Sequence, residues 1–433
     1  MMMNTRTKRS LRASAYLGAT ALVVLGTTGC DDFLDVRNPN VIDAADIDPV
    51  QDGNLFARSA FQTLASAYGN VIVYSAWFSN EAWVGDTFPT RNEYGRRAVD
   101  FTNGTHNGDV WFPLARSVAQ GEQVLDILTG EPDQELNLAR GAFTSGFGLV
   151  LMAETFCEGT MWQSGNQPGP LMNTEQLLET AVNRFERTIS EANAAGGGEA
   201  ANLATAARVG QGRALLQLGR TAEAIQAVQG VADDFVFNVP FVDDPGSRGR
   251  LGNGVFLFSA GGSRESLVVP PHYREIGQDL TDDDGEITGD PRIQFFDSGR
   301  DAQDNTLRLW SQLKFDNWAA SIDLASGLEA RYIEVEARND PAEMLAFINE
   351  RREVGGHGPY EGNDLLGELM AQRSIDFWLT ARRMGDWRRN PGAVPNIRPP
   401  GPYYKEELPD VQDQTCWPIP FNERQHNPNL PRP

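Results

Sequence analysis

The chain has 433 residues, of which 37 are Lys or Arg and 59 are Asp or Glu, so its formal net charge at pH 7 is −22. Hydrophobic residues make up 40% of the sequence, which is enough for a large core, and the length suits roughly two to three conventional domains or one large helical array. Nucleic-acid binding is disfavoured, because no cluster of Lys and Arg with interleaved aromatic residues occurs beyond the N-terminus.

Residues 1–29 have the composition of a sorting signal. Four basic residues precede an apolar run from Ala13 to Gly26, which is long enough for a signal peptide but too short to span a bilayer. The run ends with small residues before Cys30, a pattern that resembles a bacterial lipobox, in which the thiol is acylated and becomes the new N-terminus. Thr27 stands where the lipobox usually has Leu, so the alternative is an ordinary secretory signal with an unmodified Cys30.

Either signal takes the protein out of the cytoplasm. Removal of residues 1–29 leaves a net charge of −26, so membrane attachment would depend on the acyl chains at Cys30 and not on charge. No other run of 18 apolar residues occurs, and we expect no membrane-spanning segment in the rest of the chain. Cys157 and Cys416 would then lie in an oxidising compartment, either bonded to each other or apart as buried thiols.

The first half of the mature chain predicts helices. Residues 30–52 are polar and predict an extended tether. Apolar residues at helical spacing then predict helices at 53–69, from Asp109 to Gly130, and at 136–153. The segment between the first two, which is rich in aromatic residues, is expected to be a loop.

The clearest helix begins at Asn173, which can cap it together with Gln176 in a capping box. Its apolar residues form one stripe between Leu177 and Ile189, which is typical of an amphipathic helix. A second helix is expected at 203–218 and a third after Gly219. The stretch 214–225 resembles the middle of a tetratricopeptide repeat, although any antiparallel helix pair could show it.

Helical periodicity is lost between about residues 232 and 325, where Gly, Asp and Pro are frequent and short β-prone pieces occur at 255–258 and 266–270. Helices are expected again at 326–338, after the N-cap residue Asp340, and from Leu365 to Met384. The last 44 residues contain 11 of the 25 prolines, so they should form an extended, non-helical tail.

These elements predict a mostly α-helical protein. We expect a tetratricopeptide-like array of helix pairs at about 53–231 and 326–389, an irregular loop-rich insertion at about 232–325, and an extended Pro-rich tail at 390–433. All of these parts, residues 53–433, would form a single domain.

Several short motifs, taken in order, resemble the SusD/RagB family of nutrient-binding outer-membrane lipoproteins, and the likeness covers almost the whole mature chain. The motifs are Cys30–Val36, Asp290–Arg292, Ser326–Ala337, Asn349–Gly355, Gln372–Arg389, Cys416–Pro420 with Glu423, and Asn427–Leu430. The sequence departs from the family pattern at Gln372, where Glu is usual, and at Thr380-Ala381, where Glu-Gly is usual.

The departures fall in a charged region that the family uses structurally. The substitutions at Gln372 and Thr380-Ala381 therefore put in question the ion pairing around these positions, and not the function that the resemblance implies. We expect Arg373, Asp376, Arg383 and Asp386 to act as i,i+3 and i,i+4 neighbours that hold helix ends and the C-terminal tail.

The resemblance implies a surface-exposed outer-membrane lipoprotein that binds oligosaccharide and delivers it to a TonB-dependent, SusC-like transporter. In that family the helical array packs on the transporter, and the lipoprotein acts as a lid. The ligand site would come partly from the N-terminal region and partly from the irregular insertion.

Aromatic rings and planar polar groups suit sugar binding, because rings stack on the CH faces of sugars while amides, carboxylates and guanidinium groups bond to hydroxyls. Segment 74–94 is the richest in such residues. The candidate ligand-binding residues are Asn80, Trp83, Asp86, Arg91 and Tyr94 from this segment, and Tyr273, Trp310 and Trp318 from the insertion. Core packing is the competing explanation for each aromatic residue, and it is favoured for Trp77 and Phe78.

Catalysis finds little support in the sequence, and we expect no enzyme activity, metal site or cofactor. The four histidines, His106, His272, His357 and His426, occur singly without a zinc-site spacing and are expected in exposed loops. No nucleophile-elbow or phosphate-loop motif occurs, and no pair of carboxylates is singled out. The acidic stretch 281–286 fails as a calcium loop, since an EF-hand register on Gly285 would put Leu280 and Pro291 at ligand positions.

Two alternatives to oligosaccharide binding remain at this stage. The same machinery could capture peptides, as some relatives do. The protein could also be a helical scaffold for envelope assembly that binds no small ligand.

Overall fold

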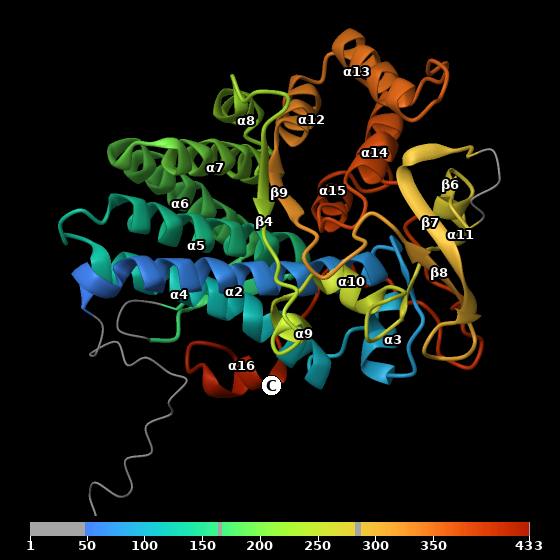
Figure 1. Ribbon diagram of the computed structural model, residues 1–433, viewed down its shortest axis with the longest axis horizontal. Helices are drawn as coiled ribbons and strands as arrows, with labels where there is room; N and C mark the ends of the chain where they lie inside the picture. Colours follow the sequence, from blue (N-terminus) through green and yellow to red (C-terminus); the bar gives the residue numbers. More distant parts are fainter. Residues whose placement is uncertain (1–47, 163–166, 282–286, 433) are drawn as a thin grey trace, which may run out of the picture. The chain divides into compact units, whose positions relative to one another are not determined.

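Antiparallel helices make up most of the computed structural model (Figure 1), which describes residues 48–432 apart from 163–166 and 282–286. The predicted signal peptide, Cys30, most of the tether and most of the acidic stretch 281–286 lie outside the described residues. The described part from Pro49 onward forms one compact unit.

The helical array follows the chain. Its helices are α2 (Pro49–Phe78), α4 (Phe112–Leu128), α5 (Glu135–Thr155), α6 (Thr174–Ala195), α7 (Gly198–Gln217) and α8 (Thr221–Val228). Successive members lie antiparallel and pack on one another, and α12 (Gly327–Arg338) packs on α7 and α8 (Figure 1). This arrangement confirms the predicted mostly helical, tetratricopeptide-like fold.

Helix α5 lies at the centre of the array, between α4 and α6. By length and composition this helix could cross a membrane. In the structure, however, 89% of its most apolar 18-residue stretch is buried inside the fold, as expected for a core helix. The predicted capping box at the start of α6 is also confirmed, because the Asn173 side chain accepts from the Gln176 backbone N–H at 2.8 Å and the Gln176 side chain accepts from the Asn173 N–H at 3.0 Å.

The remaining helices lie in the second half of the chain or are short. They are α13 (Pro341–Val354), α14 (Leu365–Asp376), α15 (Arg383–Arg389), α3 (Pro89–Gly95), α9 (Arg248–Leu251), α10 (Gly254–Phe258), α11 (Pro271–Arg274), α16 (Phe421–His426) and a π-helix at His106–Trp111. Asp340 caps α13 as predicted, since its carboxylate accepts from the Ala342 and Glu343 N–H groups at 2.9 Å.

Short strands connect distant parts of the chain. They are β1 (Trp83–Val84), β2 (Glu158–Thr160), β3 (Leu171–Asn173), β4 (Val236–Val239), β5 (Leu267–Val268), β6 (Gly277–Asp279), β7 (Asp290–Asp301), β8 (Arg308–Gln312) and β9 (Ile322–Ser326). Among the described residues they pair as β1–β5, β2–β3, β4–β9 and β6–β7–β8. The pair β1–β5 attaches the insertion to the segment after α2, and the pair β4–β9 joins the two ends of the insertion.

Four local predictions were wrong. Helix α2 continues to Phe78 through the segment expected to be a loop, because its aromatic residues are buried on all sides. Residues 255–258 belong to helix α10, which the Asn253 side chain caps, and not to a strand. The long strand β7 was missed. The Pro-rich tail contains helix α16, which begins directly after Pro420.

The predicted helix from Leu365 to Met384 is interrupted, which is a fifth correction. Helix α14 ends at Asp376, and Leu379 and Ala381 adopt left-handed φ angles of 57° and 58° before α15 begins at Arg383. These conformations are held by burial, since both residues are almost fully enclosed. Apolar periodicity cannot reveal such a break, because the residues in it are as apolar as those of a buried helix.

Candidate functional site

Two half-buried tryptophans come together where the insertion meets the end of α2. Trp83 lies opposite Val268 in the β1–β5 pair, and the next residue, Val269, donates its N–H to the Trp310 carbonyl on β8 at 2.8 Å. Both indole rings pack against the same small cluster, formed by Val268, Ala302 and Leu309. The structure thus brings together one candidate from segment 74–94 and one from the insertion.

The C-terminal tail adds two further residues beside Trp83. The Tyr404 ring stacks on the Trp83 ring with centroids 4.3 Å apart and planes at 8°. The guanidinium carbon of Arg398 lies 5.2 Å from the Trp83 centroid and 4.7 Å from that of Tyr404. We call Trp83, Tyr404, Arg398, Trp310 and Arg274 the aromatic platform.

Asn80 holds the first half of the platform in place. Its Oδ1 accepts from Trp83 Nε1 and from Arg398 Nη2, both at 3.0 Å, and its Nδ2 donates to the Asn396 carbonyl at 2.8 Å. Asn80 has a φ of 66°, a left-handed conformation that Asn tolerates better than most residues. This turn ends α2 and directs Trp83 toward the tail.

Trp310 forms the second half with Arg274, the last residue of α11. The Arg274 guanidinium carbon lies 4.6 Å from the Trp310 centroid, and the Phe295 ring packs on Trp310 edge to face at 5.9 Å. His272 lies on the same one-turn helix as Arg274 and hydrogen-bonds to the Asn80 backbone, so α11 connects the two halves of the platform.

Three of the candidate residues lie inside the fold, which corrects their assignment to a ligand-facing surface. Asp86 and Arg91 are buried and form an ion pair with each other. The Tyr94 side chain is fully buried, and its hydroxyl hydrogen-bonds to Nδ1 of His106 at 2.7 Å. Because these side chains are buried and bond to one another or to neighbouring protein groups, they stabilise the segment and do not form a ligand-facing surface.

Tyr273 and Trp318 are also core residues. Tyr273 is 3% exposed and packs on Trp378, while Trp318 is 8% exposed and packs between Phe256 and Arg248. Of the predicted ligand-binding residues, Asn80, Trp83 and Trp310 remain as predictions, because they are partly exposed and lie together. Trp77 and Phe78 are buried in the core, as the sequence favoured.

The sequence missed the tail residues Arg398 and Tyr404 and the α11 residues His272 and Arg274. The tail signal was present as an Arg and two adjacent Tyr residues within a Pro-rich stretch. Nothing in the sequence, however, indicates that this stretch packs beside Trp83, because the two are more than 300 residues apart in the chain.

Several buried titratable groups lie close to the platform. Burial raises the pKa of Glu81 to about 7, although its carboxyl accepts from the Leu379 N–H at 3.2 Å. Burial, together with the positive charges of Arg383 and Arg398, lowers the pKa of His272 to about 3. His272 is therefore uncharged at neutral pH.

His106 contradicts the expectation that the histidines lie in exposed loops. Its side chain is fully buried, and its Nε2 donates to the Pro418 carbonyl at 2.7 Å while Nδ1 faces the Tyr94 hydroxyl. Burial lowers the pKa of His106 to about 4. The residue links the N-terminal region to the tail and has no free nitrogen for catalysis.

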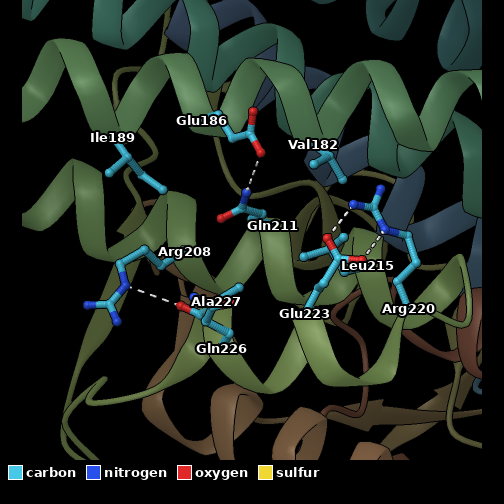
Figure 2. A pocket seen from close by; sticks show the side chains of 10 residues that line it. All are labelled: Val182, Glu186, Ile189, Arg208, Gln211, Leu215, Arg220, Glu223, Gln226 and Ala227. Atoms are coloured by element: carbon cyan, nitrogen blue, oxygen red, sulfur yellow. Dashed lines mark hydrogen bonds and ion pairs between the residues drawn. The ribbon is translucent and has the colours of Figure 1, made fainter.

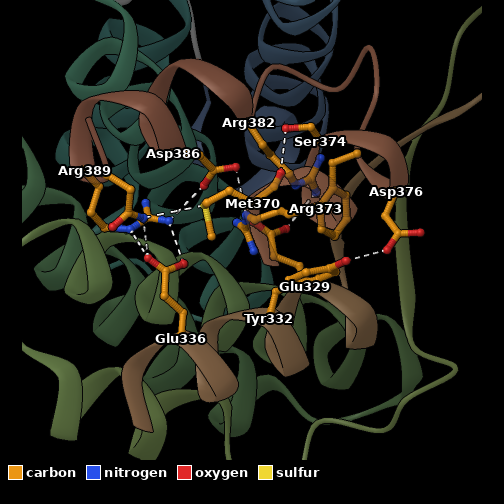
Figure 3. Close-up of polar contacts among 12 residues, drawn as sticks. Glu329, Tyr332, Glu336, Met370, Arg373, Ser374, Asp376, Arg382, Asp386 and Arg389 are labelled. Carbon is orange, nitrogen blue, oxygen red and sulfur yellow. Dashed lines mark hydrogen bonds and ion pairs between the residues drawn. The ribbon is translucent and has the colours of Figure 1, made fainter. Parts of the chain in front are cut away.

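The charged region around α14 and α15 forms ion pairs between elements (Figure 3). Arg373 pairs with Asp386 at 2.8 Å, Arg382 with Glu329 at 2.7 Å and Arg389 with Glu336 at 2.7 Å. The expected i,i+3 and i,i+4 spacing was wrong for most of these pairs, because the break between α14 and α15 folds the segment onto α12.

The substituted positions also have partners. Gln372 accepts from Arg292 at 2.9 Å and donates to Glu368 at 2.9 Å, and the Thr380 carbonyl accepts from the Tyr68 hydroxyl at 2.9 Å. Asp376 accepts from Tyr332, Arg292 and Arg351 at 2.6 to 3.0 Å. These contacts favour a structural role for the network.

A groove lies between α6, α7 and α8, remote in sequence from the platform (Figure 2). This groove has a volume of about 320 Å³ and mixed lining residues. They are Val182, Glu186, Ile189, Arg208, Gln211, Leu215, Arg220, Glu223, Gln226 and Ala227. Its arginines are occupied, since Arg220 pairs with Glu223 and Glu179, and Arg208 donates to the Ala227 carbonyl at 3.1 Å. The groove therefore presents few free polar groups to a ligand.

No group of three or more His, Cys, Asp or Glu side chains that could hold a metal ion occurs in the part of the chain that the structure describes. The two cysteines outside the signal region, Cys157 and Cys416, are joined by a disulfide across a sequence separation of 259.

No protein-family model matches the sequence, and no curated protein matches it. Solved structures do match. A SusD-like carbohydrate-binding protein from Bacteroides fragilis has 14% identity and a TM-score of 0.63, over 87% of this chain and 98% of that one. A SusD/RagB family protein from Bacteroides thetaiotaomicron has 14% identity and a TM-score of 0.62, over 87% and 94%.

A third similar structure is the surface glycan-binding protein A of Bacteroides thetaiotaomicron in complex with laminarihexaose. It has 13% identity and a TM-score of 0.57, over 88% of this chain and 98% of that one. The alignments span nearly the whole described chain and, at these identities, report on the fold. The chain therefore has the fold of the SusD/RagB proteins.

Proposed function

We propose that this protein is an oligosaccharide-binding lipoprotein of the SusD/RagB type, not an enzyme, that is anchored to the outer membrane through an acylated Cys30 and exposed at the cell surface. It captures glycan on the aromatic platform and delivers it to a TonB-dependent, SusC-like transporter.

The observation that carries the proposal is the pair of half-buried indole rings, Trp83 on β1 and Trp310 on β8. Both strands contact β5, and both rings pack against one apolar cluster. Rigid rings present a flat apolar surface at low entropic cost, which suits the CH face of a sugar. The Asn80 amide and the Arg398 guanidinium beside Trp83 supply groups that hydrogen-bond to hydroxyls.

The anchor and the transporter rest on other features. The lipobox-like end of the N-terminal signal supports acylation, and several acyl chains give the stable attachment that a single chain does not. Among solved proteins with this fold, one was found with laminarihexaose, which supports a glycan ligand. Delivery to a transporter follows from the resemblance of the motif series.

Calorimetric titration after a glycan-array screen tests the ligand class. We expect micromolar to millimolar binding that Trp83→Ala or Trp310→Ala weakens by on the order of tenfold or more, since stacking on a ring contributes about 1 to 3 kcal/mol. Phe112→Ala is the matched control, because Phe112 is 58% exposed on α4 and is not part of the platform. Absence of glycan binding, or peptide binding that survives both Trp substitutions, contradicts the proposal.

Metabolic labelling with radioactive palmitate tests the anchor separately. The label should appear on the wild-type chain in a bacterial host that processes lipoproteins, and Cys30→Ser should abolish it. Co-purification with an outer-membrane barrel from the native host tests delivery. Labelling that persists in Cys30→Ser would place the lipid elsewhere and remove the proposed attachment.

A further inference from the structure

Arg398 is an unpaired cation at the edge of the aromatic platform. It is half-buried, and its hydrogen-bond acceptor is the neutral Asn80 amide. In the part of the chain that the structure describes, no carboxylate forms an ion pair with it, and the groups that act on its charge are the hydroxyls of Tyr403 and Tyr404. Burial lowers the pKa of Arg398, while the hydroxyls of Tyr404 and Tyr403 act in the opposite direction.

The groups that face Arg398 from neighbouring elements are also basic or neutral. His272 on α11 is largely enclosed, and its Nε2 has no hydrogen-bond partner among the described residues. Arg383 on α15 is 3% exposed, donates to the Ser79 and Pro395 carbonyls, and leaves Nη1 without a partner in the same part of the chain. Glu81 does not act on the charge of Arg398, and Asp304, which acts on the Tyr404 hydroxyl, is already paired with Lys405 at 2.6 Å.

The second half of the platform carries a similar cation. Arg274 covers one face of Trp310, its Nε lacks a hydrogen-bond partner, and it has no ion pair among the residues described. Three carboxylates, on Glu275, Asp279 and Asp297, act on Arg274 from further away, and Asp297 is already paired with Arg308 at 2.7 Å.

Other buried arginines have carboxylates or backbone carbonyls as acceptors. Arg213, Arg382 and Arg389 each pair with a glutamate. Arg97, Arg383 and Arg388 have no ion pair among the described residues but donate to backbone carbonyls. Leaving a partly desolvated guanidinium without a counter-charge is unfavourable, and the chain has an excess of 22 acidic over basic groups from which a partner could have come. The unpaired cations lie beside the two half-buried indole rings of the platform.

We propose that the aromatic platform binds an oligosaccharide that carries acidic groups, uronate carboxylates or sulfate esters, with Arg398 as its specificity-determining residue and Arg274 as a second cationic contact. The proposal rests on the proposed function and adds the charge of the ligand. A guanidinium fork suits both anions, because carboxylate and sulfate oxygens can each accept two parallel N–H bonds. The sugar rings would stack on the indoles, while the acidic group of the ligand would supply the counter-charge that Arg398 lacks.

The test compares oligosaccharides that differ in charge and in little else. Hexagalacturonate is paired with its methyl ester, and sulfated laminarihexaose with laminarihexaose, within an array of uronate-containing, sulfated and neutral glycans. Calorimetry on the purified protein should show at least tenfold tighter binding of an acidic member than of its neutral partner. The preference should shrink between about 50 and about 500 mM salt, as charge screening increases. The two pairs distinguish carboxylate from sulfate recognition.

Variants of Arg398 identify the residue responsible. Arg398→Gln should lower the affinity for the acidic ligand by on the order of tenfold more than the affinity for the neutral partner, so that the preference for the acidic ligand is lost, while Arg398→Lys should restore part of this preference. Arg116→Gln is the matched control, since Arg116 is an exposed arginine on α4 without an ion pair among the described residues. A thermal unfolding midpoint close to that of the wild type shows that each variant is folded.

The outcomes separate this inference from the proposed function. If the neutral partners bind equally well or more tightly, and Trp83→Ala abolishes this binding, the inference of an acidic ligand is wrong and the proposed glycan binding stands. An acidic preference that Arg398→Gln leaves intact would overturn the role of Arg398. Failure of every glycan, acidic and neutral, would overturn the proposed function itself.

Discussion

A single side chain, that of Asn80, joins the end of α2 to the C-terminal tail at the platform. Its amide contacts Trp83, the Arg398 guanidinium and the Asn396 carbonyl, and the left-handed backbone at this position turns the chain so that all three can be reached. A planar amide with donors and an acceptor meets this requirement, whereas a hydroxyl is too short for it. The geometry of the platform therefore depends on this one residue.

Glu81, the next residue, makes the same turn sensitive to pH. Burial raises its pKa from 4.5 to about 7, while Arg383, the Leu379 N–H and Lys314 favour the charged form and Asp386 opposes it. The folded state therefore binds more protons than the unfolded state between these two pH values. The stability that Glu81 contributes is fully present below about pH 4.5 and is lost as the pH rises through 7.

We expect Glu81→Gln to remove this component of the pH dependence. Between about pH 5 and about pH 8 the wild type should lose about 3 kcal/mol of unfolding free energy relative to the variant. Urea unfolding at a series of pH values measures the difference. Glu353→Gln, at an exposed position of α13, is the control and should run parallel to the wild type. Parallel curves for Glu81→Gln would show that the carboxyl does not titrate in this range.

At the scale of elements, the close packing of α4 on α5 depends on glycine. A Cβ atom added at Gly121 would lie 2.7 Å from the Gly141 carbonyl oxygen and 2.7 Å from the Ser145 nitrogen. Both are backbone atoms of α5, which cannot move aside as a side chain can. The sequence shows a helical period here but gives no sign that the two backbones touch.

Gly121→Ala should therefore separate α4 from α5 and lower the unfolding free energy by about 1 to 3 kcal/mol, despite the better helix propensity of Ala. Chemical denaturation measures the change. Gly104→Ala is the matched control, because a Cβ there meets no atom within 4 Å, and it should leave stability unchanged or raise it. Equal stability of the two variants would contradict the close approach.

For the described unit as a whole, the disulfide ties the C-terminal tail to the end of α5. It links Cys157, just after α5, to Cys416, with Cα atoms 5.1 Å apart. Beside it the Cys157 N–H donates to the Trp417 carbonyl at 3.1 Å, and the Trp417 side chain is fully buried. The tail is thus fixed at this end, and its preceding part carries Arg398 and Tyr404 to the platform.

The double variant Cys157→Ser with Cys416→Ser should lower the unfolding free energy by about 2 to 4 kcal/mol, because the unfolded chain regains the freedom of a loop of more than 250 residues. Hydrogen exchange should rise in residues 398–420, and glycan affinity should fall because Tyr404 supports Trp83. Wild-type exchange and affinity in the variant would show that packing alone holds the tail.

Particular residues show which features of the fold and of the candidate site could be predicted from the sequence. The helix that begins at Asn173, the capped helix after Asp340 and the buried pair Trp77 and Phe78 were predicted, because capping and apolar periodicity are local signals. The break at Leu379 and the strand β7 were missed, because tertiary burial outweighs local preference there. Of the candidate site, Asn80, Trp83 and Trp310 lie together, whereas Asp86, Arg91 and Tyr94 proved to be packing residues.

The sequence by itself determined the helical class, the order of the helices and the region from which the first rings of the platform come, since these depend on residues close together in the chain. The tertiary structure alone decided which aromatic residues stay exposed, which cysteines and charges pair, and that the tail supplies Arg398 and Tyr404 beside Trp83. The physical reason is that exposure and pairing depend on contacts between segments up to about 320 residues apart, which no local pattern encodes.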